Sequence, residues 1–251
     1  MNKIHRKIAI ITGASSKRDI GTAICRKLAK SGYNIFFTYW NAENNWPGEF
    51  VNELKTLGVN SDCKEIDFSE SEAAFNLMIS VEKKLGAPSI LINNAAYSSN
   101  DGYEKLDAEI LDIHYAVNMR TTFLLSTEFA KKFKESQLES GRIINMTSGQ
   151  DIGPMQGELA YVATKGAISA FSRSLAAELA PIGITVNAIN PGPTDSTWMN
   201  DEIREYLRPK FGLGRIGTPE DVANLIHFLV SEDGGWITGQ IIHSEGGFLR
   251  N

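Results

Sequence analysis

The residues whose types and spacing could do chemistry lie between positions 148 and 165 of this 251-residue chain. Tyr161 and Lys165 stand four residues apart, so on a helix they share one face. An ammonium beside a phenol favours the phenolate and lowers a tyrosine pKa that is ordinarily about 10. Ser148 follows an apolar run, where a strand could present its hydroxyl to the same point. Together the three could hydrogen-bond one substrate oxygen and move its proton, although Tyr161 and Lys165 alone would also fit an ordinary exposed helix face.

Short apolar runs alternate with longer segments of helical periodicity along the chain. We expect strands at about residues 7–12, 34–40, 62–68, 89–95, 142–147, 184–189 and 240–244. We expect helices at about residues 20–32, 47–57, 69–85, 107–119, 121–135, 158–179 and 218–230, with Ser69 as an N-cap. The alternation predicts an α/β fold in which helices cover both faces of a doubly wound parallel sheet of about seven strands. No linker or repeat interrupts the pattern, which indicates a single domain over residues 1–251.

Residues 191–218 form the one long irregular stretch between these expected elements. The stretch carries Trp198, Met199 and Phe211 among charged residues. A loop of this length in a compact domain is more often functional than a plain connector, so we expect a lid over a substrate site. An ordinary surface excursion with a short helix remains the alternative.

Composition excludes several classes of function. The net charge of −5 and the lack of a basic cluster argue against nucleic-acid binding. The two cysteines and four histidines show no metal-ligand spacing, so we expect no metal. We also find no signal-peptide pattern and no apolar run near the ~20 residues that span a bilayer. These features predict a cytoplasmic protein without a membrane partner.

The stretch from Thr12 to Gly21 has the arrangement of a nucleotide-binding turn, because it follows the first expected strand and leads into a helix. Glycine lets the backbone approach a pyrophosphate, and the free N–H groups of a helix start attract anions. The strict GxGxxG pattern is absent.

A set of short motifs resembles the classical branch of the short-chain dehydrogenase/reductase family. The motifs are TGASS…IG from Thr12, NNAA at 93–96, Asn118, Ser148, Tyr161-x-x-x-Lys165, PGPT at 191–194 and ITGQIIHSEGG at 237–247. They occur in the family's order, at close to its spacings, and span nearly the whole chain. Within the family, the chain resembles the 3-oxoacyl-[acyl-carrier-protein] reductases and related small-carbonyl reductases. The resemblance implies a Rossmann-type sheet, a nicotinamide cofactor and a homotetramer.

The resemblance also implies roles for four catalytic residues. Tyr161 would be the acid/base on the substrate carbonyl oxygen, and Ser148 would hydrogen-bond the same oxygen. Lys165 would lower the pKa of the tyrosine and hold the ribose hydroxyls of the nicotinamide. Asn118 would hold a water that links Lys165 to bulk solvent in a proton relay.

Cofactor contacts are implied residue by residue in the same way. The phosphate turn would use Gly13, Ser15, Ser16, Ile20 and Gly21. Around the adenosine and the nicotinamide, the implied contacts are Asp67, Phe68, Asn94, Ala95, Ala96, Pro191, Gly192 and Thr194, with Tyr161 and Lys165.

Three departures from the family pattern stand out. The turn has two extra residues between Gly13 and Gly21, and Lys17, Arg18 and Asp19 replace its inner glycine region, so we expect it to bulge. Ala96 stands where the family has glycine, which leaves room for the cofactor. Glu245 stands where aspartate is usual, and we expect little effect.

Cofactor preference is predicted from two places. The second strand ends in Thr38, Tyr39, Trp40 and Asn41, without the acidic side chain that would accept from a ribose 2′-hydroxyl. Lys17 and Arg18 lie in the turn, where a cation can pair with a 2′-phosphate. We therefore predict NADP(H), with NAD(H) as the alternative if both cations are merely solvated.

The favoured function is NADPH-dependent reduction of a ketone or a 3-oxoacyl thioester. The alternative within enzymes is a dehydrogenase of a sugar, a polyol or another secondary alcohol. An enoyl reductase is disfavoured, because that branch spaces its tyrosine and lysine more widely than Tyr161 and Lys165. A non-catalytic nucleotide-binding regulator is the alternative of another class, and it need not keep the whole set of Asn118, Ser148, Tyr161 and Lys165.

Overall fold

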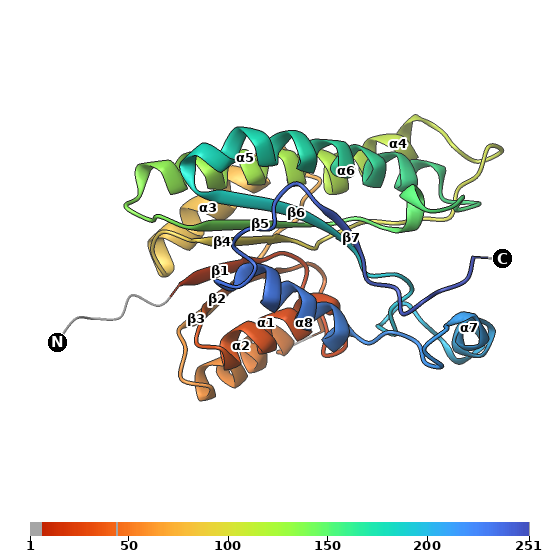
Figure 1. Cartoon of the computed structure of the whole chain (residues 1–251), viewed down its shortest axis with the longest axis horizontal. Coiled ribbons are helices and arrows are strands. Elements are labelled where there is room, and N and C mark those ends of the chain that lie inside the picture. The colour runs from red at the N-terminus through yellow and green to blue at the C-terminus, as the bar shows by residue number, and fades with distance from the viewer. Residues whose placement is uncertain (1–6, 44, 251) are drawn as a thin grey trace.

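A computed structural model describes residues 7–43 and 45–250 of the chain. Seven parallel strands form one sheet in the order β3-β2-β1-β4-β5-β6-β7 (Figure 1). The strands are β1 (Ile8–Ile11), β2 (Asn34–Tyr39), β3 (Ser61–Glu65), β4 (Ile90–Asn93), β5 (Gly141–Met146), β6 (Ile184–Asn190) and β7 (Ile241–His243).

Helices cover both faces of this sheet, as Figure 1 shows. One face carries α1 (Ile20–Lys30), α2 (Trp46–Thr56) and α8 (Pro219–Val230). The other carries α3 (Ala73–Lys84), α4 (Ala108–His114), α5 (Thr121–Glu135) and α6 (Leu159–Leu179). The shorter elements are the π-helix η1 (Tyr115–Arg120), the 3₁₀ turns η2 (Gly149–Asp151), η3 (Ala180–Ile182) and η4 (Arg208–Lys210), and α7 (Asp201–Leu207).

The buried strands explain why two separate cores form. In β1, Ala9 and Ile11 belong to the core beneath α1, α2 and α8, whereas Ile8 and Ile10 belong to the core beneath α3, α5 and α6. Successive side chains of a strand point to opposite faces, so a strand covered on both faces is apolar at every position. This is why the strands read as continuous apolar runs in the sequence.

The strand order places an opening at one edge of the sheet. β1 pairs with β2 on one side and with β4 on the other, and the chain builds the sheet outward in opposite directions from this point. The loops after the carboxyl ends of β1 and β4 therefore diverge to opposite faces. In open α/β sheets, ligands bind in the crevice at such a switch point.

Two helix boundaries differ from the expected ones. The third helix begins at Ala73 with Glu72 as its N-cap, so the expected cap at Ser69 is wrong. The reason is local: the Asp67 carboxylate accepts from Ser69 N at 2.8 Å, which holds a side-chain turn instead of a helix start. The helices expected at 107–119 and 121–135 are joined without a break by η1.

The segment 191–218 folds over the carboxyl edge of the sheet and contains α7 and η4 (Figure 1). Met199, Leu207, Phe211 and Ile216 form a small apolar cluster of their own within it. Among the residues that the structure describes, no helix is long and apolar enough to cross a bilayer. No group of three or more potential metal ligands lies within 7–43 and 45–250 either.

Candidate active site

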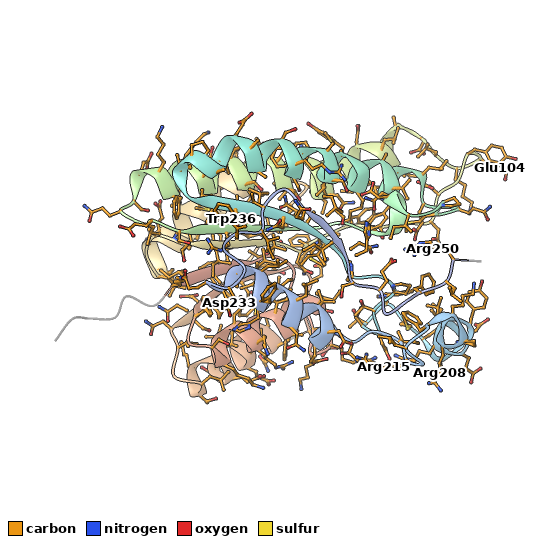
Figure 2. All side chains as sticks on the ribbon, in the orientation of Figure 1. Glu104, Arg208, Arg215, Asp233, Trp236 and Arg250 are labelled. Carbon is orange, nitrogen blue, oxygen red and sulfur yellow. The ribbon has the colours of Figure 1, made fainter. Side chains whose placement is uncertain are left out.

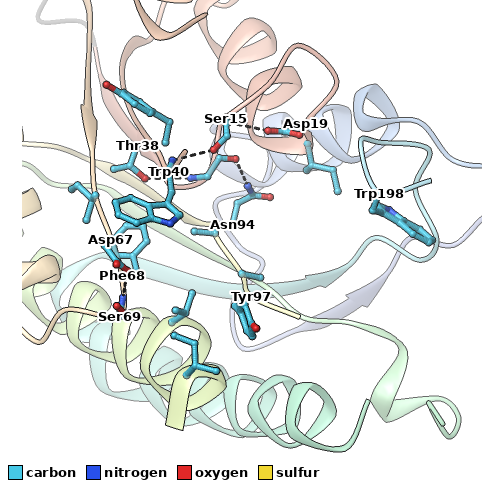
Figure 3. Close-up of a pocket in the computed structure, with 18 of the residues that line it drawn as sticks. Ser15, Asp19, Thr38, Trp40, Asp67, Phe68, Ser69, Asn94, Tyr97 and Trp198 are labelled. Atoms are coloured by element: carbon cyan, nitrogen blue, oxygen red, sulfur yellow. Dashed lines mark hydrogen bonds between the residues drawn. The ribbon is translucent and has the colours of Figure 1, made fainter. Parts of the chain in front are cut away.

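Two adjoining cavities lie along the carboxyl edge of the sheet. The smaller, about 570 Å³, is enclosed by the loops after β1, β2 and β3, with Trp40 and Asp67 among its walls (Figure 3). The larger, about 730 Å³, contains Ser148, Tyr161 and Lys165. The two share five lining residues, so they form one continuous cleft; these are Ile20, Asn94, Ala96, Ser196 and Trp198.

Tyr161 lies in the first turn of α6 and lines the larger cavity. Burial, and to a smaller extent the nearby Glu158 charge, raise the pKa of Tyr161 to about 12. An interaction with the Ser148 hydroxyl acts in the opposite direction and lowers this pKa. The phenol is therefore protonated at neutral pH. This arrangement makes Tyr161 a proton donor with a second hydroxyl beside it.

Lys165 lies one turn further along α6 and is almost fully buried. Its Nζ donates to the main-chain oxygen of Met146 at 2.8 Å and lies 5.4 Å from the centre of the Tyr161 ring. Burial lowers the pKa of Lys165 to about 8. We expected the pKa of Tyr161 to be lowered, whereas it is raised in this structure, and burial of the phenol is the largest cause.

Ser148 is positioned by a hydrogen-bond chain that the sequence did not reveal. Ser148 N donates to Gln150 Oε1 at 3.0 Å, and Gln150 Nε2 donates to Ser169 Oγ on α6 at 3.1 Å. Ser169 Oγ in turn donates to Asp151 Oδ2 at 2.8 Å. The chain fixes the loop after β5 against the helix that carries Tyr161, so the two hydroxyls stay together.

Asn118 lies in the π-helix η1 and is fully buried. Its Nδ2 donates to Tyr97 O at 2.8 Å and to Thr164 Oγ1 at 3.1 Å, and its Oδ1 accepts from Tyr97 N at 2.7 Å. Asn118 thus ties the loop after β4 to α6. Both amide hydrogens are occupied, so a water held here would bond to Oδ1 or to the main-chain carbonyl of Asn118.

The lengthened turn after β1 is held by the Asp19 carboxylate. Its Oδ2 accepts from Ser15 N at 2.9 Å and from Ser16 N at 2.8 Å, and its Oδ1 accepts from Ser16 Oγ at 2.8 Å. Two amides expected to face a phosphate are therefore bonded to a side chain. The N–H groups of Ile20, Gly21 and Thr22 precede the first helical bond, Ala23 N to Asp19 O at 3.1 Å, so α1 presents these three at its start.

Glycine is required where the turn meets α1. A Cβ at Gly21 would overlap the carbonyl oxygen of Gly13, and a Cβ at Gly13 would lie 2.9 Å from Ala95 Cα. Asn94 Nδ2 closes this contact by donating to the carbonyl oxygens of Thr12 and Gly13, both at 2.9 Å. The backbone at the bottom of the cleft thus carries no side chain at Gly13 and Gly21, as close approach of a dinucleotide requires.

Comparison with known proteins identifies the family. A family model described as "Enoyl-(Acyl carrier protein) reductase" matches residues 13–249. YjdA of Bacillus subtilis, described as an uncharacterised oxidoreductase, is 65% identical over 250 residues and covers 100% of both chains. The 3-oxoacyl-[acyl-carrier-protein] reductase FabG of Rickettsia bellii is 35% identical and covers 99% of each chain. The chain belongs to the short-chain dehydrogenase/reductase family.

Solved structures agree with this assignment. A short-chain dehydrogenase/reductase from Serratia marcescens matches with a TM-score of 0.87 at 30% identity, covering 96% of this chain and 97% of that one. A blue fluorescent protein from a metagenomic library, solved with NADPH, matches with a TM-score of 0.88 at 29% identity over the same shares. The fold is therefore the Rossmann-type fold of short-chain dehydrogenases/reductases, and the chain is an NAD(P)-dependent oxidoreductase.

The cleft of this short-chain dehydrogenase/reductase fits a dinucleotide. Its two halves run from the loops after β2 and β3 to Tyr161, and Ile20 at the start of α1 lines both. Of the residues that the sequence assigned to the cofactor, the adenosine half is lined by Gly13, Ser15, Ile20, Asp67, Phe68, Asn94, Ala95 and Ala96. The other half is lined by Tyr161, Lys165, Pro191, Gly192 and Thr194.

Four residues assigned to the cofactor lie outside both cavities of this short-chain dehydrogenase/reductase: Ser16, Lys17, Arg18 and Gly21. Arg18 Nη2 bonds to Asp195 Oδ1 at 2.7 Å, on the first part of the 191–218 segment. No lysine or arginine of the described chain lines the adenosine half, whereas Asp19 and Asp67 do. The cations that suggested NADP(H) are thus not aimed at the adenosine half in this structure.

Sequence reasoning missed a second wall of the larger cavity, formed by the chain segment after β7. Glu245 accepts from Asn190 Nδ2 at 2.7 Å and pairs with Arg250, whose Nη1 donates to Glu245 Oε2 at 2.8 Å. Arg250 lies between the α6 layer and α7 (Figure 2), and a Cβ at Gly153 would approach its Cδ to 2.9 Å. Glu245, for which we expected little effect, thus anchors one wall.

Proposed function

We propose that the protein is an NADPH-dependent reductase of a ketone, with 3-oxoacyl thioesters as candidate substrates. The observation that carries the proposal is that Tyr161 and Ser148 line the same cavity of about 730 Å³ as buried Lys165. The names of FabG relatives at 32–36% identity support the thioester.

Each residue has a stated task in this mechanism. A bound NADPH would supply hydride to the carbonyl carbon. Tyr161 donates its proton to the carbonyl oxygen, and Ser148 hydrogen-bonds that oxygen as negative charge develops on it. Lys165 stabilises the phenolate that remains and hydrogen-bonds the nicotinamide ribose hydroxyls. Asn118 holds the water through which Tyr161 recovers its proton.

The raised pKa of Tyr161, about 12, keeps the phenol protonated at neutral pH, as a proton donor to a ketone oxygen must be. Reduction needs a phenol that is protonated before the reaction, and this phenol is protonated throughout the neutral range. Oxidation of an alcohol would need a phenolate instead. The spacing of Tyr161 and Lys165 is our reason for preferring ketone reduction to the enoyl reduction named by the family model.

The test of the mechanism is the variant Tyr161→Phe, which removes the hydroxyl and keeps the ring. We expect kcat for ketone reduction to fall by about 10²- to 10⁴-fold, the contribution of a positioned acid. Binding of NADPH, followed by nucleotide fluorescence, should persist. Tyr103→Phe is the control, since Tyr103 is 86% exposed. Unchanged turnover in Tyr161→Phe would exclude the proposed role, and a cofactor-binding protein that reduces no ketone would be a regulator instead.

We propose NADPH over NADH because β2 ends in Tyr39 and continues into Trp40 and Asn41, none of which is acidic. A 2′-phosphate there would meet no carboxylate from β2, and Arg18 could exchange Asp195 for the phosphate. We expect kcat/KM for NADPH to exceed that for NADH by at least about tenfold, the value of one charge-assisted bond. Arg18→Ala should remove most of the difference. A higher kcat/KM with NADH would contradict the proposal and would agree with the lack of cations in the adenosine half.

A further inference from the structure

Glu158 is an acidic side chain in the larger cavity that the proposed mechanism does not use. It is half-buried and lines the cavity together with Ser148 and Tyr161. Glu158 stands three residues before Tyr161, at the N-cap of the helix that carries the tyrosine. Its charge acts on the tyrosine hydroxyl strongly enough to raise the pKa of Tyr161. The carboxylate therefore lies close to the point where the substrate carbonyl must bind.

The local fold does not need a glutamate at this position. Glu158 is the N-cap residue of α6, yet its side chain makes no capping bond. Asp101, from the loop after β4, caps the helix instead: its Oδ1 accepts from Leu159 N at 2.7 Å and its Oδ2 from Ala160 N at 2.8 Å. Glutamate is also not among the residues that N-caps favour. Helix formation thus gives no reason for this side chain.

The side chain of Glu158 forms no hydrogen bond or ion pair with any other described residue, whereas its main-chain oxygen accepts from Val162 N at 2.9 Å. The three cations that line the cavity bond elsewhere: Arg250 pairs with Glu245, Lys210 Nζ donates to Tyr206 Oη at 2.8 Å, and Lys165 Nζ donates to Met146 O at 2.8 Å. Burial, and secondly the charge of Asp101, raise the pKa of Glu158. A half-buried carboxylate without a donor destabilises the protein, and a ligand that brings a donor removes this penalty.

We propose that Glu158 binds a hydroxyl group on the carbon next to the reacting carbonyl, so that the substrates are hydroxyketones. This inference rests on the proposed ketone reduction and narrows it. The hydroxyl donates to Glu158 while the carbonyl oxygen accepts from Tyr161 and Ser148, and the substrate is thereby held at two neighbouring oxygens. Such two-point binding also fixes which face of the carbonyl is reduced.

The test compares two ketones of nearly equal shape, phenacyl alcohol and propiophenone, which differ by a hydroxyl in place of a methyl group. With NADPH and the wild-type protein, kcat/KM for phenacyl alcohol should exceed that for propiophenone by about tenfold or more, the value of a hydrogen bond to a charged group. Glu158→Gln should reduce this ratio, and Glu158→Met should bring it near one. Glu178→Gln is the matched control, on the exposed side of the same helix.

A second measurement reports where the carboxylate lies. Because the Glu158 charge contributes to the raised pKa of Tyr161, Glu158→Gln should lower that pKa, as the alkaline titration of tyrosine absorbance, with Tyr161→Phe subtracted, would detect. The groups that face this region are Asp101, Lys165, Lys210, Glu245 and Arg250. None of them changes in the variant, so the shift belongs to Glu158.

The outcomes separate the inference from the function on which it rests. Equal kcat/KM for the two ketones, or a ratio that survives in Glu158→Met, overturns the hydroxyketone assignment and leaves ketone reduction standing. A preference for phenacylamine over phenacyl alcohol also overturns it, since the carboxylate would then select an ammonium. If the wild-type protein reduces neither ketone, the proposed function fails as well.

Discussion

The ammonium of Lys165 is buried at the end of β5, where the carbonyl oxygen of Met146 holds it. A cation in such a place is costly, and burial accordingly lowers the pKa of Lys165 to about 8. Burying this charge lowers the stability of the fold, whether or not a cofactor is bound. Lys165 therefore links catalysis to the stability of the fold.

This link predicts a pH dependence. Between pH 8 and the unfolded-state value of 10.5, the unfolded chain binds more protons at this lysine than the folded chain, so stability rises with pH. Below pH 8 both states are protonated and the penalty is fully present. From pH 8 to 10, the free energy of unfolding of the wild type should rise by ~2 kcal/mol relative to Lys165→Met, as urea denaturation would measure. If the free energies of unfolding of the wild type and Lys165→Met changed in parallel with pH, the prediction would be contradicted.

Residue by residue, the sequence predicted the parts of the site that motifs encode. Ser148, Tyr161 and Lys165 do meet in one cavity, and Gly13 and Asn94 meet at the start of α1. Side chains that act outside any motif were not predicted from the sequence. Asp19 was noticed only as a departure, although its carboxylate binds the amides of its own turn. The amides of Ser15 and Ser16 could bind either a cofactor phosphate or the Asp19 carboxylate. The choice depends on the folded path of the loop, which residue spacing alone does not encode.

At the scale of elements, Asp195 joins the segment 191–218 to the turn after β1. Arg204 on α7 donates to both carboxylate oxygens of Asp195, at 3.0–3.1 Å, and Arg18 reaches it from the turn. Thr197 Oγ1 adds a bond to Asp19 Oδ1 at 3.0 Å. The segment 191–218 is thus fastened to the turn after β1.

Asp195→Asn should loosen this fastening, because two guanidinium groups lose a charged acceptor. We expect faster cleavage within residues 201–215 under limited proteolysis, and a rise of KM for ketone by several-fold. Charge-assisted bonds are stronger than neutral ones, and exposure to solvent reduces their contribution. Asp233→Asn, an exposed change just beyond the C-terminal end of α8, is the control. Equal cleavage rates in the two variants would show that Asp195 does not hold the lid.

The elements themselves were mostly predictable, since the strands and long helices follow strong apolar periodicities. The start of α3 was not, because Asp67 diverts the chain into a turn before Ala73. The π-helix between α4 and α5 was not either, since apolar spacing across Tyr115–Arg120 gives no sign of a widened turn. In both places, a few specific contacts override local propensity.

On the scale of the whole molecule, apolar side chains remain exposed on the outer faces of the helices, away from the sheet. Leu111, Tyr115 and Leu124 are 43–47% exposed along α4, η1 and α5, and Trp236 is 98% exposed beyond α8. These side chains come from separate elements, so they suggest more than one contact surface.

We propose that the protein is a homotetramer, as its family resemblance implies. Light scattering should give four times the mass of one chain at micromolar concentration. Leu124→Arg, which places a charge on the exposed face of α5, should shift the protein towards smaller species. The exposed Lys131 offers a control in Lys131→Arg on the same helix. A monomer mass for the wild type would contradict the proposal.

The π-helix that carries Asn118 makes the site depend on the length of the chain as well as on its composition. A π turn contains one residue more than an α turn. Deleting a single residue near Val117 would let α4 and α5 run on as one regular helix, and it would remove the widened turn that contains Asn118. The apolar faces could still find partners, whereas Tyr97 and Thr164 could not both keep the amide of Asn118. The length of the chain in this turn therefore sets the position of Asn118. A protein that lost the extra residue would still fold, but the hydrogen bonds that position Asn118 would be broken.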